Sequence, residues 1–185
     1  MKKFSLGLLL ASLVIVAFTA FKSGTQMATL NYIDQWKEIA IENQREYGIP
    51  ASITLAQGIH ESASGTSKMA RGANNHFGIK CLGWSGGSYF PSGNTRNSCY
   101  RKYDMAEDSF CDHARILKSK PRYAFLFKLE VTNYKGWAKG LKKAGYASHP
   151  KYPLYLIRII EDYNLAQYDE IALSGQQVQD SVEVF

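Results

Sequence analysis

The sequence lacks a second long run of apolar residues. Its one such run, Leu6–Ala20, stands at the start of a chain of 185 residues, so a membrane protein with several spans is excluded. Hydrophobic residues make up 45% of the chain and aromatic residues 13%, which excludes disorder along its whole length. The length allows one domain with short tails.

The apolar run is typical of a secretory signal or an N-terminal membrane anchor, because Lys2 and Lys3 precede it. Small residues at 17–20 favour cleavage without forming a clean cleavage motif, and no cysteine lies nearby for a lipid anchor. We therefore expect export to the periplasm or cell exterior with residues 1–20 removed; a retained anchor is the alternative. The exported protein would be envelope-associated, and an anchor would be its only contact with a membrane.

Cysteine is scarce, with three residues in the chain. Export permits a disulfide, and Cys81 and Cys99 flank a segment rich in Gly, Ser and Asn that a bridge would close. Cys111 lies in a helical stretch and is expected to be a free, small apolar side chain. Three free thiols are the alternative.

Helical periodicity and turn residues predict a mainly α (α+β) domain over residues 31–169, with a linker at 21–30 and a polar, mobile tail at 170–185. Two short strands would form a hairpin lobe, leaving a groove between it and the helices. Helices are expected at 31–47, from Pro50 to about 64, and at 67–71. Three more are expected from an Asp104 cap to Pro121, from 132 or 133 to Gly145, and from Pro153 onward. Strands are expected at 77–81 and 98–103, joined by turns that include 92–94.

The second helix carries the residue of most chemical interest, Glu61. Helical spacing places Thr54, Gln57, Gly58 and Glu61 on one polar arc. The absent side chain of Gly58 would let a ligand approach one turn before Glu61, and the helix C-terminus favours a protonated carboxyl. A protonated Glu in a groove is what a glycosidase general acid requires. A solvated surface carboxylate is the alternative.

Several separated motifs together resemble glycoside hydrolase family 73, the bacterial endo-β-N-acetylglucosaminidases of peptidoglycan that include flagellar and autolysin domains. The resemblance covers about residues 31–165. It rests on Leu55–Ser62, Gly65–Ser67, Ala73–Lys80, Tyr103–Asp104, Glu107–Ser109, Tyr134–Leu141 and Ala144–Pro150.

The resemblance implies a lysozyme-like helical fold with a hairpin lobe. It implies Glu61 as catalytic acid, Tyr146 as an active-site tyrosine, and Asn75 and Phe77 as residues of the sugar groove. Simpler interpretations are packing behind a helix end for Tyr146, strand core for Phe77 and a turn for Asn75. Gln57 and Asp104 complete the candidate substrate-binding residues.

Sequences of this family commonly carry acidic residues in the hairpin, as a source of the second catalytic carboxylate. This sequence departs from that pattern, because it has no Asp or Glu between Glu61 and Asp104. Three alternatives remain for the second catalytic group. It is Asp104, or it is the substrate's own N-acetyl group assisted by Tyr146, or it is missing and catalysis is very weak. We interpret Asp104 as a helix cap.

Other chemistries have little support. The four histidines match no zinc spacing and are interpreted as structural or surface residues, and no cysteine has the local motif of a Cys–His hydrolase. No metal or cofactor is implied.

The net charge is +6, and residues 62–103 carry six cations without an acid: Lys68, Arg71, Lys80, Arg96, Arg101 and Lys102. One interpretation is that these cations lie on a solvated hairpin. The other is that they attract the anionic stem peptides of peptidoglycan or another envelope polyanion. Nucleic acid is a poor partner for an exported chain.

These observations predict an exported, monomeric peptidoglycan hydrolase that cleaves the β-1,4 bond after N-acetylglucosamine. A non-catalytic or weakly active glycan-binding module on the same scaffold is one alternative, motivated by the acid-free hairpin. A lytic transglycosylase, which needs one acid and no activated water, is the other.

Overall fold

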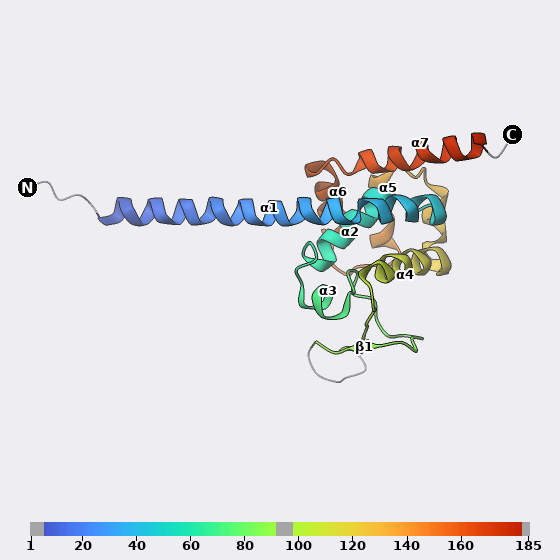
Figure 1. Cartoon of the computed structure of the whole chain (residues 1–185), viewed down its shortest axis with the longest axis horizontal. Coiled ribbons are helices and arrows are strands. Elements are labelled where there is room, and N and C mark those ends of the chain that lie inside the picture. The colour runs from blue at the N-terminus through green and yellow to red at the C-terminus, as the bar shows by residue number, and fades with distance from the viewer. Residues whose placement is uncertain (1–5, 92–97, 183–185) are drawn as a thin grey trace, which may run out of the picture.

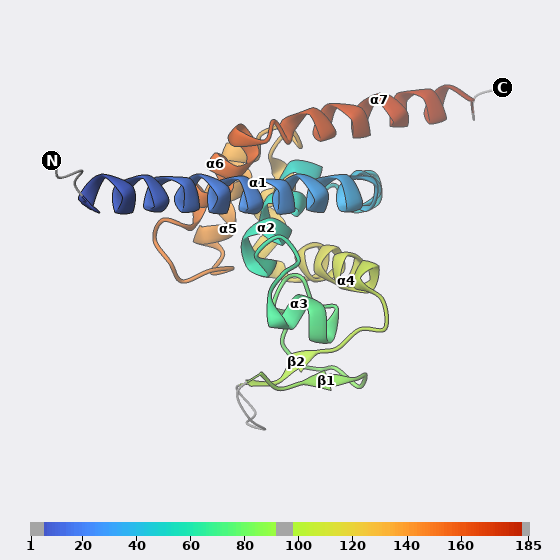
Figure 2. The ribbon, with the colours of Figure 1, turned by 60° about the vertical axis from the view of Figure 1, so that its left-hand side comes forward.

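A computed structural model describes residues 6–91 and 98–182, with side chains described for residues 24–91 and 98–175. Helices surround a central helix, α2, and a small two-stranded sheet lies at the end of the domain away from α7 (Figures 1 and 2). This confirms the mainly helical fold with a hairpin lobe. The elements are α1 (Leu6–Tyr47), α2 (Ala51–Ser62), α3 (Lys68–Ala73), β1 (Ser88–Tyr89), β2 (Tyr100–Arg101), α4 (Ala106–Ser119), the 3₁₀ helix η2 (Pro121–Lys128), α5 (Tyr134–Lys143), α6 (Tyr152–Asp162) and α7 (Ala166–Val182).

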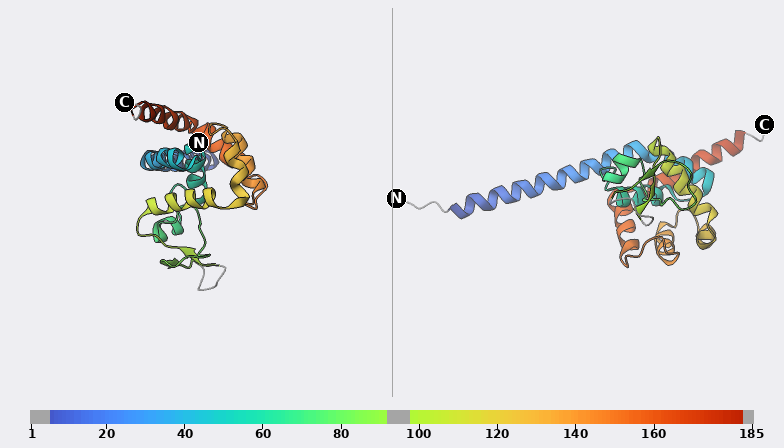
Figure 3. Two further views of the ribbon diagram at one scale, coloured as in Figure 1. Left: turned by 90° about the vertical axis from the view of Figure 1, so that its right-hand side faces the viewer. Right: turned by 90° about the horizontal axis from the view of Figure 1, so that it is seen from below.

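Helix α1 is continuous through residues 21–30, so the expected linker and the expected start at residue 31 are wrong. The segment contains one glycine, Gly24, and no proline, and a single glycine is tolerated inside a helix. The first half of α1 extends beyond the other elements, and its C-terminal part packs on the domain through Tyr32, Trp36 and Ala40 (Figure 3). Among the residues whose side chains the structure describes, no helix is long and apolar enough to cross a bilayer; the apolar run at residues 6–20 lies outside them.

Helix α2 is buried on nearly every side, because α1, α6 and α7 all pack against it. The polar arc that helical spacing predicted does not face solvent along most of its length, because Thr54, Gln57 and Gly58 are all buried. The helix ends where Ala63, Ser64 and Gly65 adopt positive φ angles, as the glycine predicted.

Gly58 makes room for another side chain of the protein, and not for a ligand as expected. A Cβ at this position would overlap the Tyr32 hydroxyl. That hydroxyl lies 2.9 Å from Nδ1 of His76, so the close approach joins α1, α2 and the start of the hairpin lobe.

The hairpin lobe differs from its prediction in one strand. β2 lies inside the expected 98–103, but it pairs with β1 at 88–89, in the segment expected to form turns. Residues 77–81 contribute a single bridge, between Lys80 and Tyr100. The reason is Asn75, whose side chain bonds both the N–H and the C=O of Ile79 and so holds this stretch as a loop.

A disulfide joins Cys81 to Cys99, as predicted, with Cα atoms 5.5 Å apart. Cys111 is a free thiol, half-buried on α4. The bridge closes the hairpin lobe over a sequence separation of 18, which limits the freedom of the unfolded chain. The turn expected at 92–94 lies outside the described residues.

The start of α4 corrects the expected Asp104 cap. The helix begins at Ala106 with Met105 as its N-cap residue, and the Asp108 carboxylate accepts a hydrogen bond from the Met105 N–H. The carboxylate that caps α4 thus comes from Asp108, in the first turn of the helix, and not from Asp104 before it. By contrast, Asn133 caps α5 by accepting from the Gly136 N–H at 2.9 Å, as predicted.

Helix α7 contradicts the expected mobile tail, since the helix continues to Val182 and Ala172 is buried. Asp169 fixes it to α2 by accepting from the Ser52 N–H at 2.8 Å and the Ser52 hydroxyl at 2.6 Å. Pro50, the N-cap residue of α2, offers no side-chain cap, so Asp169 satisfies this helix start from a distant part of the chain.

Candidate functional site

A cleft of about 1050 Å³ lies between the end of α2, the hairpin lobe, the junction of α4 with η2, and the loop that joins α5 to α6. Glu61, Phe77 and Tyr146, three of the predicted site residues, line it. The remaining lining residues are His60, Met69, Gly78, Ile79, Lys80, Leu82, Tyr100, Arg101, His113, Ile116, Lys120, Pro121, Arg122, Tyr123, Ala147, Ser148, His149 and Tyr152.

Glu61 lies in the last turn of α2, where the helix reaches the cleft. Part of its side chain is exposed, but the surrounding walls remove water from the carboxyl and raise its pKa. A hydrogen bond with the Tyr152 hydroxyl opposes this effect. The net direction is upward, which keeps a larger fraction of the carboxyl protonated near neutral pH.

Tyr152 connects Glu61 to a residue behind the cleft. Nε2 of Gln57 donates to the Tyr152 hydroxyl at 2.9 Å, and Gln57 itself is fully buried. Gln57 therefore reaches the cleft only through Tyr152. The sequence analysis missed Tyr152, because its proximity to α2 is set by the packing of α6 and has no local motif.

Tyr146 follows α5 and lies over Tyr152, with ring centroids 5.8 Å apart and planes 22° apart. Burial raises the pKa of its hydroxyl well above the ordinary value, and the neighbouring Tyr152 and Glu61 add to the shift. The hydroxyl is therefore neutral over the working range of enzymes and acts as a hydrogen-bonding group.

The floor of the cleft contains a histidine that was not singled out as a site residue. The His113 ring stacks on Phe77 at a centroid distance of 4.0 Å and meets the Tyr146 ring edge-on at 6.0 Å. Both ring nitrogens are buried without a hydrogen-bond partner among the described residues. Burial lowers the pKa of His113 to about 3, so the imidazole is neutral.

Asn75 does not line the cleft. It is buried and donates to the carbonyls of Ile79 and Arg101 at 3.0 and 2.8 Å. Its side chain thus holds together the two segments of the hairpin lobe that form one wall, which is closer to the turn interpretation than to sugar contact.

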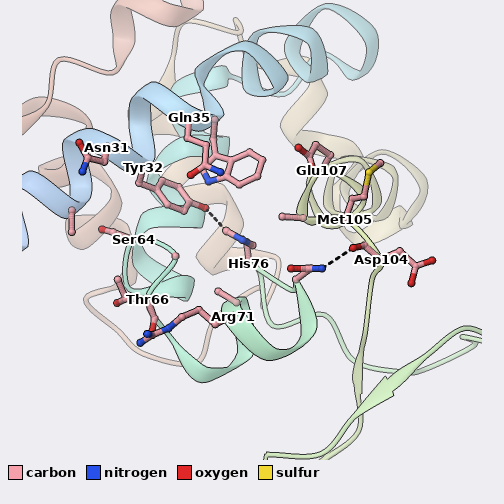
Figure 4. A pocket seen from close by; sticks show the side chains of 16 residues that line it. Asn31, Tyr32, Gln35, Ser64, Thr66, Arg71, His76, Asp104, Met105 and Glu107 are labelled. Atoms are coloured by element: carbon pink, nitrogen blue, oxygen red, sulfur yellow. Dashed lines mark hydrogen bonds between the residues drawn. The ribbon is translucent and has the colours of Figure 1, made fainter.

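Asp104 lies elsewhere, in a second cavity of about 680 Å³ between α1, α3 and the start of α4. Figure 4 shows it in the same cavity as Tyr32, Arg71 and His76, and its backbone carbonyl accepts from the Asn74 side chain at 2.9 Å. Sequence alone could not exclude Asp104 from the cleft, because only the path of the chain between β2 and α4 decides which cavity it enters.

Glu61 is the only Asp or Glu lining the cleft in the part of the chain that the structure describes. Residues 92–97, whose placement is not described, include no acidic residue in the sequence. The described residues also contain no cluster of three or more His, Cys, Asp or Glu side chains suited to a metal ion. Among the described residues, Glu61 is therefore the one carboxyl available for acid–base chemistry in this cleft.

Two further histidines flank the cleft beside Glu61. The rings of His60 and His149 both contact Tyr155, with centroids 5.5 and 5.4 Å from that of Tyr155. Burial and the neighbouring His149 lower the pKa of His60. These rings form a rim of the cleft and hold the loop that carries Tyr146 near α2 and α6.

Comparison with known proteins agrees with this arrangement. The family model described as mannosyl-glycoprotein endo-beta-N-acetylglucosaminidase, the glucosaminidase family, matches residues 37–165. The exo-glucosaminidase LytG of Bacillus subtilis is 35% identical over 151 residues, which cover 72% of this chain and 51% of that protein. The peptidoglycan hydrolase FlgJ of Vibrio parahaemolyticus is 29% identical over 134 residues, 66% of this chain and 43% of its own.

The chain thus spans about half the length of these curated relatives. Among solved structures, the catalytic domain of the autolysin Auto from Listeria monocytogenes superposes with a TM-score of 0.65 at 26% identity, covering 76% of this chain and 87% of that one. The matched region contains α2, the hairpin lobe and the loop after α5, and hence the whole cleft. The chain belongs to the glucosaminidase family.

Proposed function

We propose that the chain is an exported peptidoglycan hydrolase that cleaves the β-1,4 bond after N-acetylglucosamine, with Glu61 as its general acid. One observation carries the proposal: among the described residues Glu61 is the only Asp or Glu that lines the cleft, and desolvation by the cleft walls raises the pKa of its carboxyl. A raised pKa is the property that a carboxyl needs to donate a proton to a leaving glycosidic oxygen. The names of the relatives, a glucosaminidase and a peptidoglycan hydrolase, support the substrate class.

The bond-breaking step begins with proton transfer from Glu61 to the glycosidic oxygen. Positive charge then develops on the sugar ring, in a transition state that resembles an oxocarbenium ion. The conjugate carboxylate of Glu61 regains its hydrogen bond from Tyr152, which stabilises the charge left after proton transfer. In this proposal Tyr146, whose ring stacks on that of Tyr152, orients the reacting sugar.

The second catalytic group is not a protein carboxylate in this proposal. Retaining and inverting glycosidases with two carboxyls hold them about 5–5.5 Å or about 6.5–9.5 Å apart. No second Asp or Glu lines the cleft among the described residues. The substrate's own N-acetyl oxygen, held by the neutral Tyr146 hydroxyl, is the nucleophile that we propose: it bonds to the anomeric carbon as the bond to the protonated leaving oxygen breaks. Water then attacks the same carbon, gives its proton to the Glu61 carboxylate and displaces the N-acetyl oxygen, which returns Glu61 to its protonated form.

The deciding experiment compares wild type with Glu61→Gln on purified peptidoglycan. The amide keeps the shape of the side chain and lacks the transferable proton, so cleavage should fall by at least about 100-fold while binding to sacculi persists. Glu107→Gln, at an exposed acid of the second cavity, is the matched control and should retain wild-type turnover. Product release by Glu61→Gln at the wild-type rate would exclude Glu61 as the acid.

The single carboxyl also favours a second candidate, a lytic transglycosylase, because that reaction uses one acid and no activated water. Mass spectrometry of the products separates the two reactions. A reducing N-acetylglucosamine end supports the proposed hydrolase, and an anhydro-muramyl end supports the transglycosylase. Binding without any product would indicate a glycan-binding module.

A further inference from the structure

Basic side chains line the cleft from two facing elements, the hairpin lobe and the start of η2. Lys80, Lys120 and Arg122 all line the cleft and all are exposed. They are called the cationic wall below. Only one acidic residue, Glu61, lines the cleft among the described residues, and the proposed mechanism requires it to be protonated.

The cationic wall differs from the basic segment that the sequence suggested. Of the cations between residues 62 and 103 whose side chains are described, only Lys80 and Arg101 line the cleft, and Arg71 faces the second cavity. Arg101 pairs with Asp112 at 2.7 Å and is thereby neutralised. Lys120 and Arg122 lie outside the segment that the sequence analysis identified, at the junction of α4 and η2.

The geometry at this junction presents the two cations to the cleft. Pro121 separates Lys120 from Arg122 at the start of η2, and the Tyr123 N–H bonds the Lys120 carbonyl at 3.0 Å, which fixes the turn. The Arg122 guanidinium lies 4.6 Å from the centre of the Tyr123 ring. Across the cleft, the Lys80 ammonium lies 3.7 Å from the centre of the Tyr100 ring. Aromatic rings thus support charges on both sides.

We propose that the cationic wall binds the carboxylates of the peptides attached to peptidoglycan strands, so that peptide-bearing glycan is preferred over bare glycan. This proposal rests on the proposed function. A strand stripped by an amidase keeps one lactyl carboxylate on each muramic acid, close to the sugar ring, whereas each attached peptide carries further carboxylates that extend away from the sugars. Arg presents paired N–H groups that match a carboxylate, and Lys supplies a point charge. Because the wall belongs to the cleft, a glycan lying beside Glu61 brings its peptides to Lys120 and Arg122.

The test measures kcat/KM on peptide-bearing strands and on the same strands stripped of peptide by an amidase. Wild type should prefer peptide-bearing strands by about fivefold, the factor expected from two exposed ion pairs. A Lys120→Gln/Arg122→Gln variant should lose that preference. A Lys128→Gln/Lys139→Gln variant removes the same charge from exposed positions outside the cleft and should keep it. Equal preference in the two variants would overturn the proposal.

Two further arms identify the ligand and separate this proposal from the proposed function. Strands treated with hydrofluoric acid lack phosphodiester polymers and should keep the preference; its loss would assign the wall to phosphate and overturn the proposal. Cosedimentation of the Glu61→Gln protein with intact and stripped sacculi requires no catalysis. It should show tighter binding to intact sacculi than to stripped sacculi. This difference in binding should shrink as the salt concentration rises from about 0.05 to 0.5 M, because salt screens exposed ion pairs. If catalysis is absent and this difference persists, only the proposed function fails.

Discussion

Gln57 and Tyr152 form a buried hydrogen bond of 2.9 Å between α2 and α6 that holds the Tyr152 hydroxyl beside Glu61. Because the Gln57 amide donates to the Tyr152 oxygen, the hydroxyl proton is directed to the Glu61 carboxyl. Gln57 is therefore a positioning residue, because it does not line the cleft and acts on Glu61 only through Tyr152. This relationship links a fully buried amide to the pKa of the proposed acid.

The first prediction concerns Tyr152→Phe. Loss of the hydroxyl removes the hydrogen bond that lowers the pKa of Glu61 and leaves the desolvation that raises it. The pKa of Glu61 should rise, so the alkaline limb of the kcat/KM profile should move to higher pH. Tyr155→Phe, on the same helix but in contact with the rings of His60 and His149, is the control and should leave that limb in place. A downward shift in Tyr152→Phe would contradict this interpretation.

The second prediction tests the role of Gly58. A Cβ there meets the Tyr32 hydroxyl, so Gly58→Ala should lower the free energy of unfolding by about 1–3 kcal/mol, despite the better helix propensity of Ala. Combining it with Tyr32→Phe should give less than the sum of the two losses, because the second change removes the clashing oxygen.

Gly24→Ala provides the control for helix propensity, since Gly24 is also helical and its Cβ would have no neighbour within 4 Å. Denaturant unfolding of the four variants measures these differences. Equal stability of Gly58→Ala and wild type would show that Tyr32 moves aside at little cost.

These two cases show what a single sequence predicts and what it does not. Helical spacing correctly placed Gln57, Gly58 and Glu61 on one side of α2. It could not show that α6 and α1 cover that side, because the covering residues, Tyr152 and Tyr32, lie far away in the sequence. Helical spacing and the family resemblance indicated Glu61, and the resemblance alone indicated Tyr146; both line one cleft.

Two further errors have different origins, one in a local contact and one in a tertiary contact. The α4 cap was misplaced by one residue because Asp108 supplies the carboxylate from within the helix. The C-terminal helix was taken for a tail because its anchor, Asp169 on Ser52, joins positions 117 residues apart. Local patterns predicted the fold class, the disulfide and most helices, but not which faces of those helices are covered.

The third prediction concerns pH dependence and His113. The folded state holds this ring neutral with a pKa of about 3, below the unfolded value of about 6.5. The unfolded state therefore binds more protons as the pH falls, and stability present above pH 6.5 is lost on acidification. His113→Phe should reduce the slope of unfolding free energy against pH, between pH 4 and 6, by about 1.4 kcal/mol per pH unit.

His113→Gln separates titration from polarity. Both variants remove the titrating group, so both should reduce the slope. Only Phe also removes the buried, unpartnered nitrogens, and at pH 7 it should be more stable than Gln by about 1–3 kcal/mol. His76, with a pKa lowered to about 4, and Asp169, with a pKa raised to about 6, remain in both variants and leave the comparison unaffected. An unchanged slope in both would show that His113 is accessible to protons in the fold.

The last prediction concerns Asp104→Asn. The Asp104 side chain lies in the second cavity, and the α4 cap is formed by Asp108, so the change removes neither a catalytic base nor a cap. The hydrogen bond that Asn74 makes goes to the Asp104 backbone carbonyl and survives the substitution. Turnover on peptidoglycan should stay within about twofold of wild type, and the free energy of unfolding within about 0.5 kcal/mol. Asp108→Asn and Asp108→Ala provide the comparison: Asn still accepts from the Met105 N–H, whereas Ala should cost about 0.5–2 kcal/mol. A folded Asp104→Asn protein with turnover reduced by the 10²–10⁴-fold typical of a lost general base would place Asp104 in the reaction after all and restore a mechanism with two carboxyls.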